Sequence, residues 1–570
     1  MSAAPKEAWS SRLGVILAVA GSAVGLGNFL RFPGLAAQYG GGAFMIAYFI
    51  SLLIIGIPIC WTEWTLGRFG GRQGYHSTAG IFHALMQKPW AKYLGVIGFV
   101  VPVIIYMYYV YIEAWALGYA VNALMGNLSI EGRDYGAFFG SFTGASADGI
   151  AFKFGVGDVG LFVVIVYLLN FFFIYRGISK GIEMVCKYAM PALIGIAIII
   201  LIRVLTLGTP DLAKPDQNVI NGLGYLWNPG AVAVIDSGGT EVARYPDAAG
   251  IPAEYQTAAF TFKDLDLWLS LMNPQLWLAA AGQIFFSLSV GFGVIITYAS
   301  YLRSQDDVVL SGLTATSANE FCEVGLGGLI TVPAAFMFLG TAGIVGQGTF
   351  GLGFNVLPQV FALMPAGHLF AAIFFILLFI AAVTSSLSML QPGIAFLEEG
   401  LGIERKASVA LLGLMTAVGT LFVWYFSKDL KALDTMDFWV GTVMLFVQAT
   451  ILVIIFGWGL GIPRGWEIAH EGAEMRIPNL FKPIIKYVTP AYLLAIFTMF
   501  MLQNIFGWNY SFTDPSFQPT GYMKDLVGDD TNSVAQLTVG FIIIITGFGL
   551  VFVNIAGKRW TKNPPAPIQD

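Results

Sequence analysis

The sequence predicts an all-α membrane protein that crosses the bilayer many times, and three observations support this fold class. Of the 570 residues, 57% are hydrophobic and only 11% are charged, and the mean hydropathy is +0.74. A soluble domain carries about 25% charged residues, so this chain has too few charges to cover a water-facing surface. Apolar runs long enough to cross a bilayer recur along the chain, and two of them contain matching glycine-rich interruptions.

Twelve spans are predicted, because the core of a bilayer requires about 20 apolar residues per helix. The spans begin near Leu13, Gly42, Leu94, Gly160, Met184, Leu276, Val309, Leu369, Ser408, Phe438, Tyr487 and Leu537. The first apolar run continues through residues 27–33 without an Ala-x-Ala site, which disfavours a cleaved signal peptide. Residues 1–570 are therefore expected to form a single transmembrane domain.

The distribution of basic residues predicts the orientation of the chain. An even number of spans places both termini on the same side of the membrane. With both termini in the cytoplasm, the inner loops hold most of the Lys and Arg residues, as the positive-inside rule requires. We therefore expect a multi-pass protein of a plasma (inner) membrane, of prokaryotic origin, with both termini cytoplasmic.

Charge and cysteine usage argue against several other classes of protein. The formal net charge is only −5, which gives no reason to expect a nucleic-acid partner. Cys60, Cys186 and Cys322 lie in separate apolar segments, without the spacing of a disulfide framework or a metal site. The sequence contains no recognisable His/Ser/Asp or metal-ligand constellation, so we do not expect an enzyme.

The first and sixth spans are predicted to be broken near their middle. Residues 21–28 and 287–293 both contain the pattern Val-Gly-apolar-Gly. Each glycine weakens a helix by about 1 kcal/mol relative to alanine, and unwound backbone at membrane depth must be buried in protein or line a wet cavity. Because five spans separate the two motifs, the second enters from the opposite side, as an inverted repeat requires. For either motif alone, close packing of small residues is the competing interpretation.

Several motifs along essentially the whole chain resemble the neurotransmitter:sodium symporter family. They occupy residues 12–33, 61–64, 108–113, 176–181, 283–286, 384–386 and 436–439, in the family's order. The resemblance implies the LeuT fold, with 12 transmembrane helices of which helices 1 and 6 are discontinuous. Its 5+5 inverted repeat would occupy about 10–208 and about 274–460, and helices 11 and 12 would occupy about 484–557. The resemblance also implies alternating access driven by sodium.

Two sodium sites are implied by the same resemblance, and all of their ligand atoms are oxygens, which hard cations prefer. The first site would use Ala23, Asn28, Ser287 and Asn319, completed by the carboxylate of the substrate. The second would use Gly21, Val24, Ala381, Thr384 and Ser385. For the two hydroxyl groups alone, hydrogen bonding to helical carbonyls is the competing interpretation.

The implied substrate is a hydrophobic or neutral L-amino acid. Relatives that carry monoamines have an Asp where this chain has Gly25, so the substrate here is expected to bring its own carboxylate. The implied binding residues are Ala23, Leu26, Gly27, Ile105, Tyr109, Phe286, Ser289, Phe292, Ser385 and Met389. Two alternatives stay open: transport of another small zwitterion (GABA, betaine or taurine), and an amino-acid and sodium sensor that does not transport.

Charged residues near the two ends of the pathway are interpreted as gates. By resemblance, Arg31 and Asp437 would form the outer gate. Lys6 and Glu399 would form the inner gate. Trp9 and Tyr301 would pack beside the inner gate.

Glu323 stands where chloride-dependent relatives have Ser, so a built-in carboxylate is expected to replace the anion. The expected partners are a small amino acid, two sodium ions and membrane lipid. Residues 229–260 are an insertion in an extracellular segment, and we expect an inert loop there. The sequence does not predict the oligomeric state.

Overall fold

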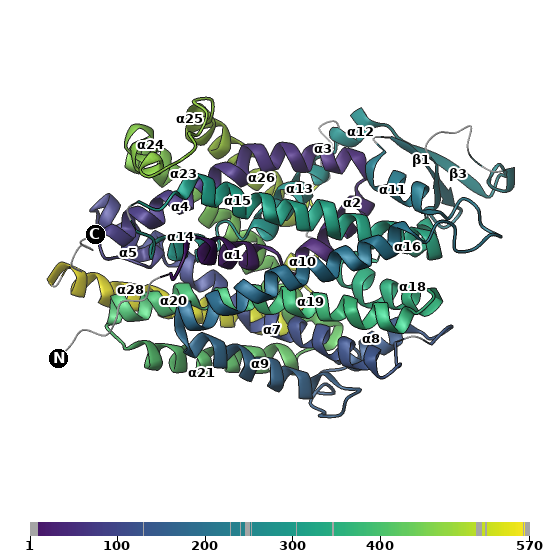
Figure 1. Ribbon diagram of the computed structural model, residues 1–570, viewed down its shortest axis with the longest axis horizontal. Helices are drawn as coiled ribbons and strands as arrows, with labels where there is room; N and C mark the ends of the chain where they lie inside the picture. Colours follow the sequence, from purple (N-terminus) through teal and green to yellow (C-terminus); the bar gives the residue numbers. More distant parts are fainter. Residues whose placement is uncertain are drawn as a thin grey trace.

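A computed structural model describes the structure of most of the chain. The described residues are 9–128, 130–228, 230–239, 241–245, 251, 253–303, 305–344, 347–508, 516–518, 521–562 and 564. They form a bundle of long helices with a small β-sheet at one end (Figure 1). The start of α1 and the end of α28 lie at the opposite end of the bundle from the sheet.

The helices of the bundle are mostly long and apolar. In the first part of the chain they are α1 (Arg12–Ala23), α2 (Phe32–Gln38), α3 (Gly42–Ser51), α4 (Ile57–Arg72), α5 (Thr78–Met86), α6 (Ala91–Leu94), α7 (Ile97–Leu124), α8 (Tyr135–Thr143), α9 (Val159–Tyr175), α10 (Met184–Leu205), α11 (Val219–Trp227), α12 (Leu267–Leu271), α13 (Pro274–Leu288) and α14 (Val294–Ala299). In the second part they are α15 (Val308–Glu320), α16 (Leu329–Leu339), α17 (Gly348–Gly351), α18 (Leu357–Leu363), α19 (Gly367–Met389), α20 (Gln391–Phe396), α21 (Arg405–Tyr425), α22 (Lys431–Met436), α23 (Leu445–Ile454), α24 (Ile462–His470), α25 (Phe481–Pro483), α26 (Thr489–Asn504), α27 (Gly521–Lys524) and α28 (Ser533–Lys562).

Among the described residues, nine continuous helical stretches are long and apolar enough to cross a membrane. They are Gly42–Arg72, Ala91–Leu124, Ile178–Leu205, Val308–Leu339, Gly367–Leu401, Arg405–Tyr425, Lys428–His470, Phe481–Asn504 and Ser533–Lys562. Each of the twelve predicted starts lies in a helix. We also expect α9, which has 17 residues, and the α13–α14 pair to cross the membrane. For these helices the crossing stays a prediction.

The surfaces of the outer helices are apolar, as contact with lipid requires. On α9, α10, α21 and α28, the side chains of Leu168, Ile199, Leu414 and Ile543 are exposed at the surface of the bundle. In contrast, α7 is buried along most of its length, where it packs against α9, α19 and α21. This pattern is that of a helix bundle surrounded by lipid, with α7 near its centre.

The first break lies between α1 and the helix that begins at Gly27. Val24 leaves the α-helical region with φ −74° and ψ 97°. The helical segments Arg12–Ala23 and Gly27–Gln38 pass the membrane test together but are bent by 47° with respect to each other. The predicted interruption of the first span is therefore confirmed.

The second break separates α13 from α14. Ser289, Gly291 and Gly293 all have positive φ values, of 53°, 81° and 78°. At Gly293, an added Cβ would lie only 1.9 Å from the carbonyl oxygen of Gly98, so close packing against α7 also requires glycine there. Both predicted breaks are thus present, and the packing of small residues accompanies the second break rather than replacing it.

Three strands form a small sheet at the end of the bundle, in and beside the segment 229–260 that was expected to be an inert loop. Strands β1 (Ala231–Asp236), β2 (Glu241–Tyr245) and β3 (Phe260–Leu265) are antiparallel in the order β2-β1-β3. Val234, Ala243 and Ile251 form a small hydrophobic core that is separate from that of the bundle. The segment therefore has regular structure, because β1 pairs with a strand along each of its edges, while its inertness stays a prediction.

Candidate functional site

A small cavity lies where the two broken helices face each other, and α7 and α19 complete its wall. Its volume is about 20 Å³, which is room for a single water molecule. The lining residues are Ser22, Ala23, Gly25, Gly27, Asn28, Ile105, Tyr109, Phe286, Ser289, Phe292, Ser385 and Met389. All of the predicted substrate-binding residues except Leu26 are in this set. The structure therefore gathers residues from four separate segments around one point.

Backbone groups freed by the first break are held by side chains around the cavity. The Gly25 N–H donates to Asn28 Oδ1 at 2.8 Å. The carbonyl of Ser22 accepts from Ser289 Oγ at 2.9 Å and from Ser385 Oγ at 3.2 Å. These bonds join both breaks to α19, so unwound backbone is stable here although it lies at membrane depth.

Gly25 leaves space that any other residue would fill. A Cβ at this position would lie 2.8 Å from Ser385 Oγ and 3.0 Å from the Tyr109 hydroxyl oxygen. Both of these hydroxyl groups line the cavity. At Gly25 the first break therefore presents only backbone to the cavity, next to the hydroxyls of Ser385 and Tyr109.

The residues of the first predicted sodium site form one buried hydrogen-bonded cluster. Asn28 Nδ2 donates to Asn319 Oδ1 at 2.9 Å, and Asn319 Nδ2 donates to Ser287 Oγ at 2.6 Å. Ala23 is the exception, since it reaches this region only as part of the cavity lining. Three oxygen-bearing side chains from α13, α15 and the first broken helix thus converge.

Glu323 lies at the centre of this cluster and is completely buried. Its carboxylate accepts hydrogen bonds from Gln283 at 2.5 Å, Asn319 at 3.3 Å and Asn28 at 3.4 Å, and from the hydroxyl of Ser287. A buried charge needs such bonds to offset the loss of hydration. The predicted chloride-replacing carboxylate is therefore directly bonded to all three side chains of the first predicted sodium site.

The hydroxyls of the second predicted sodium site lie on α19 against the end of α1. Ser385 Oγ donates to the carbonyl of Gly21 at 3.3 Å and to that of Ala381 at 3.2 Å. Thr384 Oγ1 donates to the Ala381 carbonyl at 3.0 Å. Val24 lies one residue beyond α1, where its N–H bonds to Ala20. The two hydroxyls thus bond to helical carbonyls, as the competing interpretation expected. The same bonds bring the hydroxyl oxygens close to the carbonyl oxygens of Gly21 and Ala381.

The residues of the predicted outer gate are near each other but do not form a direct ion pair. Arg31 donates to the carbonyl of Gly282 at 3.3 Å, and its guanidinium lies 5.0 Å from the ring centre of Phe286. Asp437 instead accepts from the Tyr108 hydroxyl at 2.7 Å. Asp437 still exerts the strongest favourable charge interaction on Arg31. The expected direct pair is corrected to this longer-range arrangement, because Gly282 and Phe286 hold the guanidinium over the cavity.

At the other end of the pathway, Glu399 binds the start of α5. It accepts from the N–H of Ser77 at 3.1 Å, from the Ser77 hydroxyl and from the N–H of His76. The ring of Tyr301 stacks on His76 at 4.4 Å. Tyr301 therefore lies beside Glu399 as expected, whereas the predicted partner Lys6 lies outside the described residues.

Trp9, which was expected to pack beside the inner gate, contacts Tyr298 in α14. Its indole nitrogen donates to the carbonyl of Tyr298 at 3.0 Å, and the two rings meet edge to face at 5.0 Å. Nearby, Glu183 accepts from the N–H of Ser10 at 2.9 Å and from the hydroxyls of Ser10 and Ser11. The start of α1 is therefore tied to both α14 and the start of α10.

The structure places several further residues at these sites that the sequence motifs did not indicate. The hydroxyls of Ser22 and Ser388 share a hydrogen bond of 2.7 Å beside the cavity. The Tyr108 hydroxyl donates a hydrogen bond to the carboxylate of Asp437. Serine in an apolar span next to a glycine pair is the signal that could have identified Ser22. Glu183 is visible in the sequence as an acidic residue beside an apolar run. Its partners could not be predicted, because they come from the distant start of α1.

Comparison with known proteins agrees with this geometry. The family model described as the sodium:neurotransmitter symporter family matches residues 6–134 and 254–553. The chain belongs to this family. It is consequently a sodium-dependent membrane transporter and not an enzyme, as the resemblance of the motifs implied. The match leaves out residues 135–253, which include β1 and β2.

Individual relatives extend the family match over most of the chain. An uncharacterized sodium-dependent transporter of Methanocaldococcus jannaschii is 28% identical over 509 residues, covering 87% of this chain and 90% of the relative. The sodium-dependent dopamine transporter of Bos taurus is 25% identical over 539 residues, covering 86% of this chain and 68% of that transporter. Both alignments include most of the sodium:neurotransmitter symporter match.

A solved structure confirms the fold. The crystal structure of MhsT in complex with L-phenylalanine is 27% identical to this symporter and superimposes with a TM-score of 0.69. The superposition covers 86% of this chain and 99% of the MhsT chain. The predicted LeuT fold, with its discontinuous first and sixth helices, is therefore confirmed, while the boundaries of its two repeats stay a prediction.

Proposed function

We propose that this symporter imports a hydrophobic or neutral L-amino acid together with two sodium ions, by alternating access and without chloride. The observation that carries the proposal is the cavity between the two breaks, where position 25 has no side chain and the backbone of the first break faces the hydroxyls of Tyr109 and Ser385. At about 20 Å³ the cavity is closed around this point, so its walls must move apart to admit an amino acid, as alternating access requires. MhsT, which has the same fold, was crystallised with L-phenylalanine, an amino acid of this class.

The two ends of an amino acid would meet opposite electrical environments in the cavity. The helix that restarts at Gly27 presents its N-terminus, which favours a carboxylate, and the Tyr109 hydroxyl lies next to it. The carbonyls at the end of α1 favour an ammonium group. Ile105, Phe286, Phe292 and Met389 supply the apolar surface for a side chain. Because Met is flexible, side chains of different shape can be accommodated.

Sodium would bind at the two oxygen clusters described above. Glu323 supplies a buried carboxyl group beside the first cluster, bonded to Gln283 and Asn319, and this supports transport without chloride. One charge that crosses 100 mV gains about 2.3 kcal/mol, and a tenfold gradient adds about 1.4 kcal/mol. Two ions thus provide about 7 kcal/mol, enough to concentrate a zwitterion about 10⁵-fold.

The expected location of the symporter is the plasma (inner) membrane, with both ends in the cytoplasm. Two observations support this orientation: the excess of basic residues in the corresponding loops, and the position of the start of α1 and the end of α28 at one end of the bundle (Figure 1). The sheet would then face the outside.

Uptake into proteoliposomes with an inward sodium gradient tests the proposed function. We expect accumulation of at least one neutral or hydrophobic L-amino acid, unchanged when gluconate replaces chloride. A panel that includes GABA, betaine and taurine separates the alternative zwitterions from amino acids. Saturable sodium-dependent binding without accumulation would instead support a sensor and contradict the proposal.

Gly25→Ala is expected to lower amino-acid uptake by about tenfold or more, because its Cβ would lie in the space between Ser385 Oγ and the Tyr109 hydroxyl. Gly540→Ala is the matched control, since an added Cβ there meets no atom within 4 Å. The initial rate of sodium-driven uptake is measured for both variants at equal amounts of monodisperse protein. Equal uptake by the two variants would show that the substrate does not occupy the space next to Gly25.

A further inference from the structure

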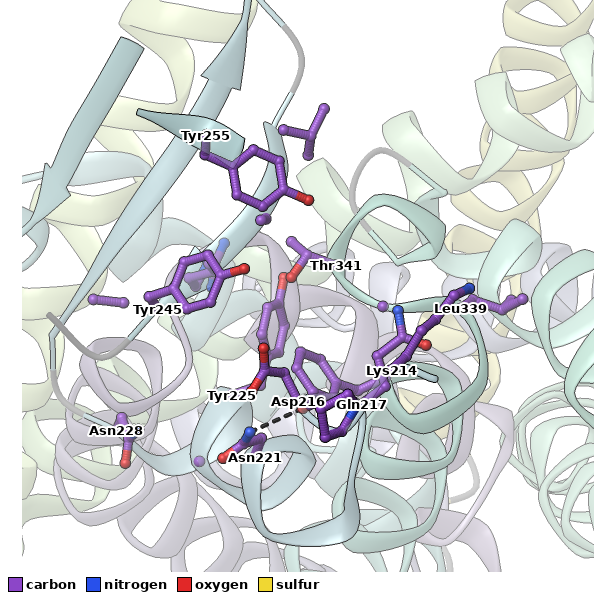
Figure 2. A pocket seen from close by; sticks show the side chains of 18 of the residues that line it. Lys214, Asp216, Gln217, Asn221, Tyr225, Asn228, Tyr245, Tyr255, Leu339 and Thr341 are labelled. Carbon is purple, nitrogen blue, oxygen red and sulfur yellow. Dashed lines mark hydrogen bonds between the residues drawn. The ribbon is translucent and has the colours of Figure 1, made fainter. Parts of the chain in front are cut away.

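A second and much larger cavity lies between the sheet and the outer end of the bundle. Its volume is about 720 Å³, within the range of cavities that hold small molecules. β1 and β2 form one wall, α11 and the segment 213–217 form another, and the end of α16 closes the cavity. Figure 2 shows Tyr245 and Tyr255 on the side of the sheet, with Tyr225, Asp216, Gln217 and Asn221 across from them.

The wall of this cavity carries charges of both signs. Lys214 and Arg244 supply two cationic groups, and Asp216 and Glu254 supply two anionic groups. The charges of the wall therefore sum to zero. A ligand with a net charge would gain nothing from such a wall, whereas a molecule with one charge of each sign can be attracted at both ends.

Arg244 provides a buried donor that has no acceptor within the described residues. Its side chain is 6% exposed, and its Nε and Nη2 donate to the two carboxylate oxygens of Glu241 at 2.7 and 3.2 Å. The guanidinium also lies 4.4 Å from the ring centre of Tyr225. Among the described residues, neither Arg244 Nη1 nor the Tyr225 hydroxyl has a hydrogen-bond partner, although both are buried. Buried groups of this kind are normally paired, so these two groups can take an acceptor in addition to Glu241, such as the carboxylate of a ligand.

The anionic groups lie near Tyr245. Burial, and then the negative environment created by Tyr255, Asp216 and Glu254, raise the pKa of Tyr245 to about 12. Asp216 is positioned by α11, because Asn221 Nδ2 donates to its backbone carbonyl at 2.8 Å, as Figure 2 shows. An ammonium group next to these oxygens would be attracted by the two carboxylates and by the phenol oxygen.

We propose that this cavity is an extracellular binding site for a free α-amino acid zwitterion, separate from the central cavity and independent of sodium. The carboxylate of the ligand would be bound by Arg244 and Tyr225, and its ammonium group by Asp216 and Glu254. The rings of Tyr245 and Tyr255 supply apolar surface for the side chain. This site is distinct from the transport site, because its lining residues differ from those of the central cavity between the broken helices.

The site is directly connected to the first broken helix. Arg244 Nη2 lies 3.5 Å from the carbonyl of Ala37 in α2, and the N–H of Gly42 donates to the carbonyl of Asn228 at 3.1 Å. α2 continues the outer half of the broken helix that contains Gly27 and Arg31. A ligand bound to Arg244 would therefore rest against the outer half of that helix.

Equilibrium binding of radiolabelled L-amino acids to the purified full-length protein tests this site. The measurement is made in sodium-free potassium buffer with an Asn28→Ala background, in which the central site is disabled. We expect saturable binding of at least one amino acid, weakened about tenfold or more by Asp216→Asn and by Tyr225→Phe, each of which removes one polar contact. Asp264→Asn, at an exposed carboxylate on β3 outside the cavity, is the matched control and should bind normally.

Two outcomes would overturn the proposal. One is the absence of saturable sodium-free binding for all common L-amino acids. The other is binding that neither cavity substitution weakens, or that a neutral saccharide displaces. Sodium-dependent binding by Asp216→Asn in an otherwise unchanged chain verifies that this variant folds. If the central amino-acid site were assigned wrongly, the unchanged chain would show no sodium-dependent binding, while the sodium-free binding would remain.

Discussion

Asn28→Ala is expected to lower the apparent sodium affinity of amino-acid uptake about 100-fold, which is the largest effect that we predict. The substitution removes the acceptor of the Gly25 N–H and the donor to Asn319 and Glu323. It therefore removes an oxygen of the first sodium cluster and at the same time releases the backbone of the first break. The measurement is the dependence of the initial uptake rate on sodium concentration in proteoliposomes.

Asn504→Ala is the control for this prediction. Asn504 lies in α26, and its side chain donates to the carbonyl of Phe500 within the same helix. We expect its sodium dependence to match that of the unchanged protein. Thermal melting of both variants in detergent shows whether Asn28→Ala retains the fold. If a folded Asn28→Ala protein took up amino acid at ordinary sodium concentrations, the assignment of the first sodium cluster would be wrong.

Glu323→Ser is expected to convert transport that does not require chloride into transport that does. Without chloride, uptake should fall about 100-fold, because the polar side chains around Glu323 lose the charged acceptor that they now share. Addition of chloride should then raise the uptake rate of Glu323→Ser at least about tenfold, because the shorter serine leaves room for an anion among the same donors. The measurement is uptake as a function of chloride concentration at constant sodium.

Glu320→Gln provides the matched control for the charge. Glu320 lies close to Glu323 in the same helical stretch, but it accepts from the Tyr48 hydroxyl at 2.8 Å. Glu320 also accepts from Asn319 Nδ2 at 3.5 Å, but the bonds from Gln283, Ser287 and Asn28 go to Glu323, so neutralisation of Glu320 should leave uptake insensitive to chloride. A chloride response in Glu320→Gln, or none in Glu323→Ser, would show that Glu323 does not stand in for the anion.

Much of the fold could be predicted because lipid imposes strict rules on the backbone. Peptide groups cannot remain unpaired in a bilayer, so long apolar runs have to be helices and conspicuous glycine pairs have to be breaks or close contacts. Gly25, Gly291 and Gly293 marked both breaks correctly. The cavity residues were implied by the family resemblance, and polar neighbours such as Asn28 and Ser289 fit the need of a broken helix at membrane depth.

Contacts between distant segments could not be predicted in this way. Arg31 and Asp437 were expected to form a direct pair, but Gly282, Phe286 and Tyr108 compete for the two groups. Such competition depends on distances of a few ångströms between separate helices. A motif records which residues are near a gate, and it does not record which partner each one contacts.

By itself, the sequence determined the membrane class, the helical fold and the two interruptions. These features follow from local composition, because apolar length and glycine content act on each segment separately. The residues around the central cavity were implied by the resemblance of the motifs to a known family. Only the tertiary structure decided that β1, β2 and β3 form a sheet, and that Arg244 and Asp216 face one cavity. Strand pairing and cavity walls depend on contacts between segments that are distant in the chain, and their free energies appear only when those segments have come together.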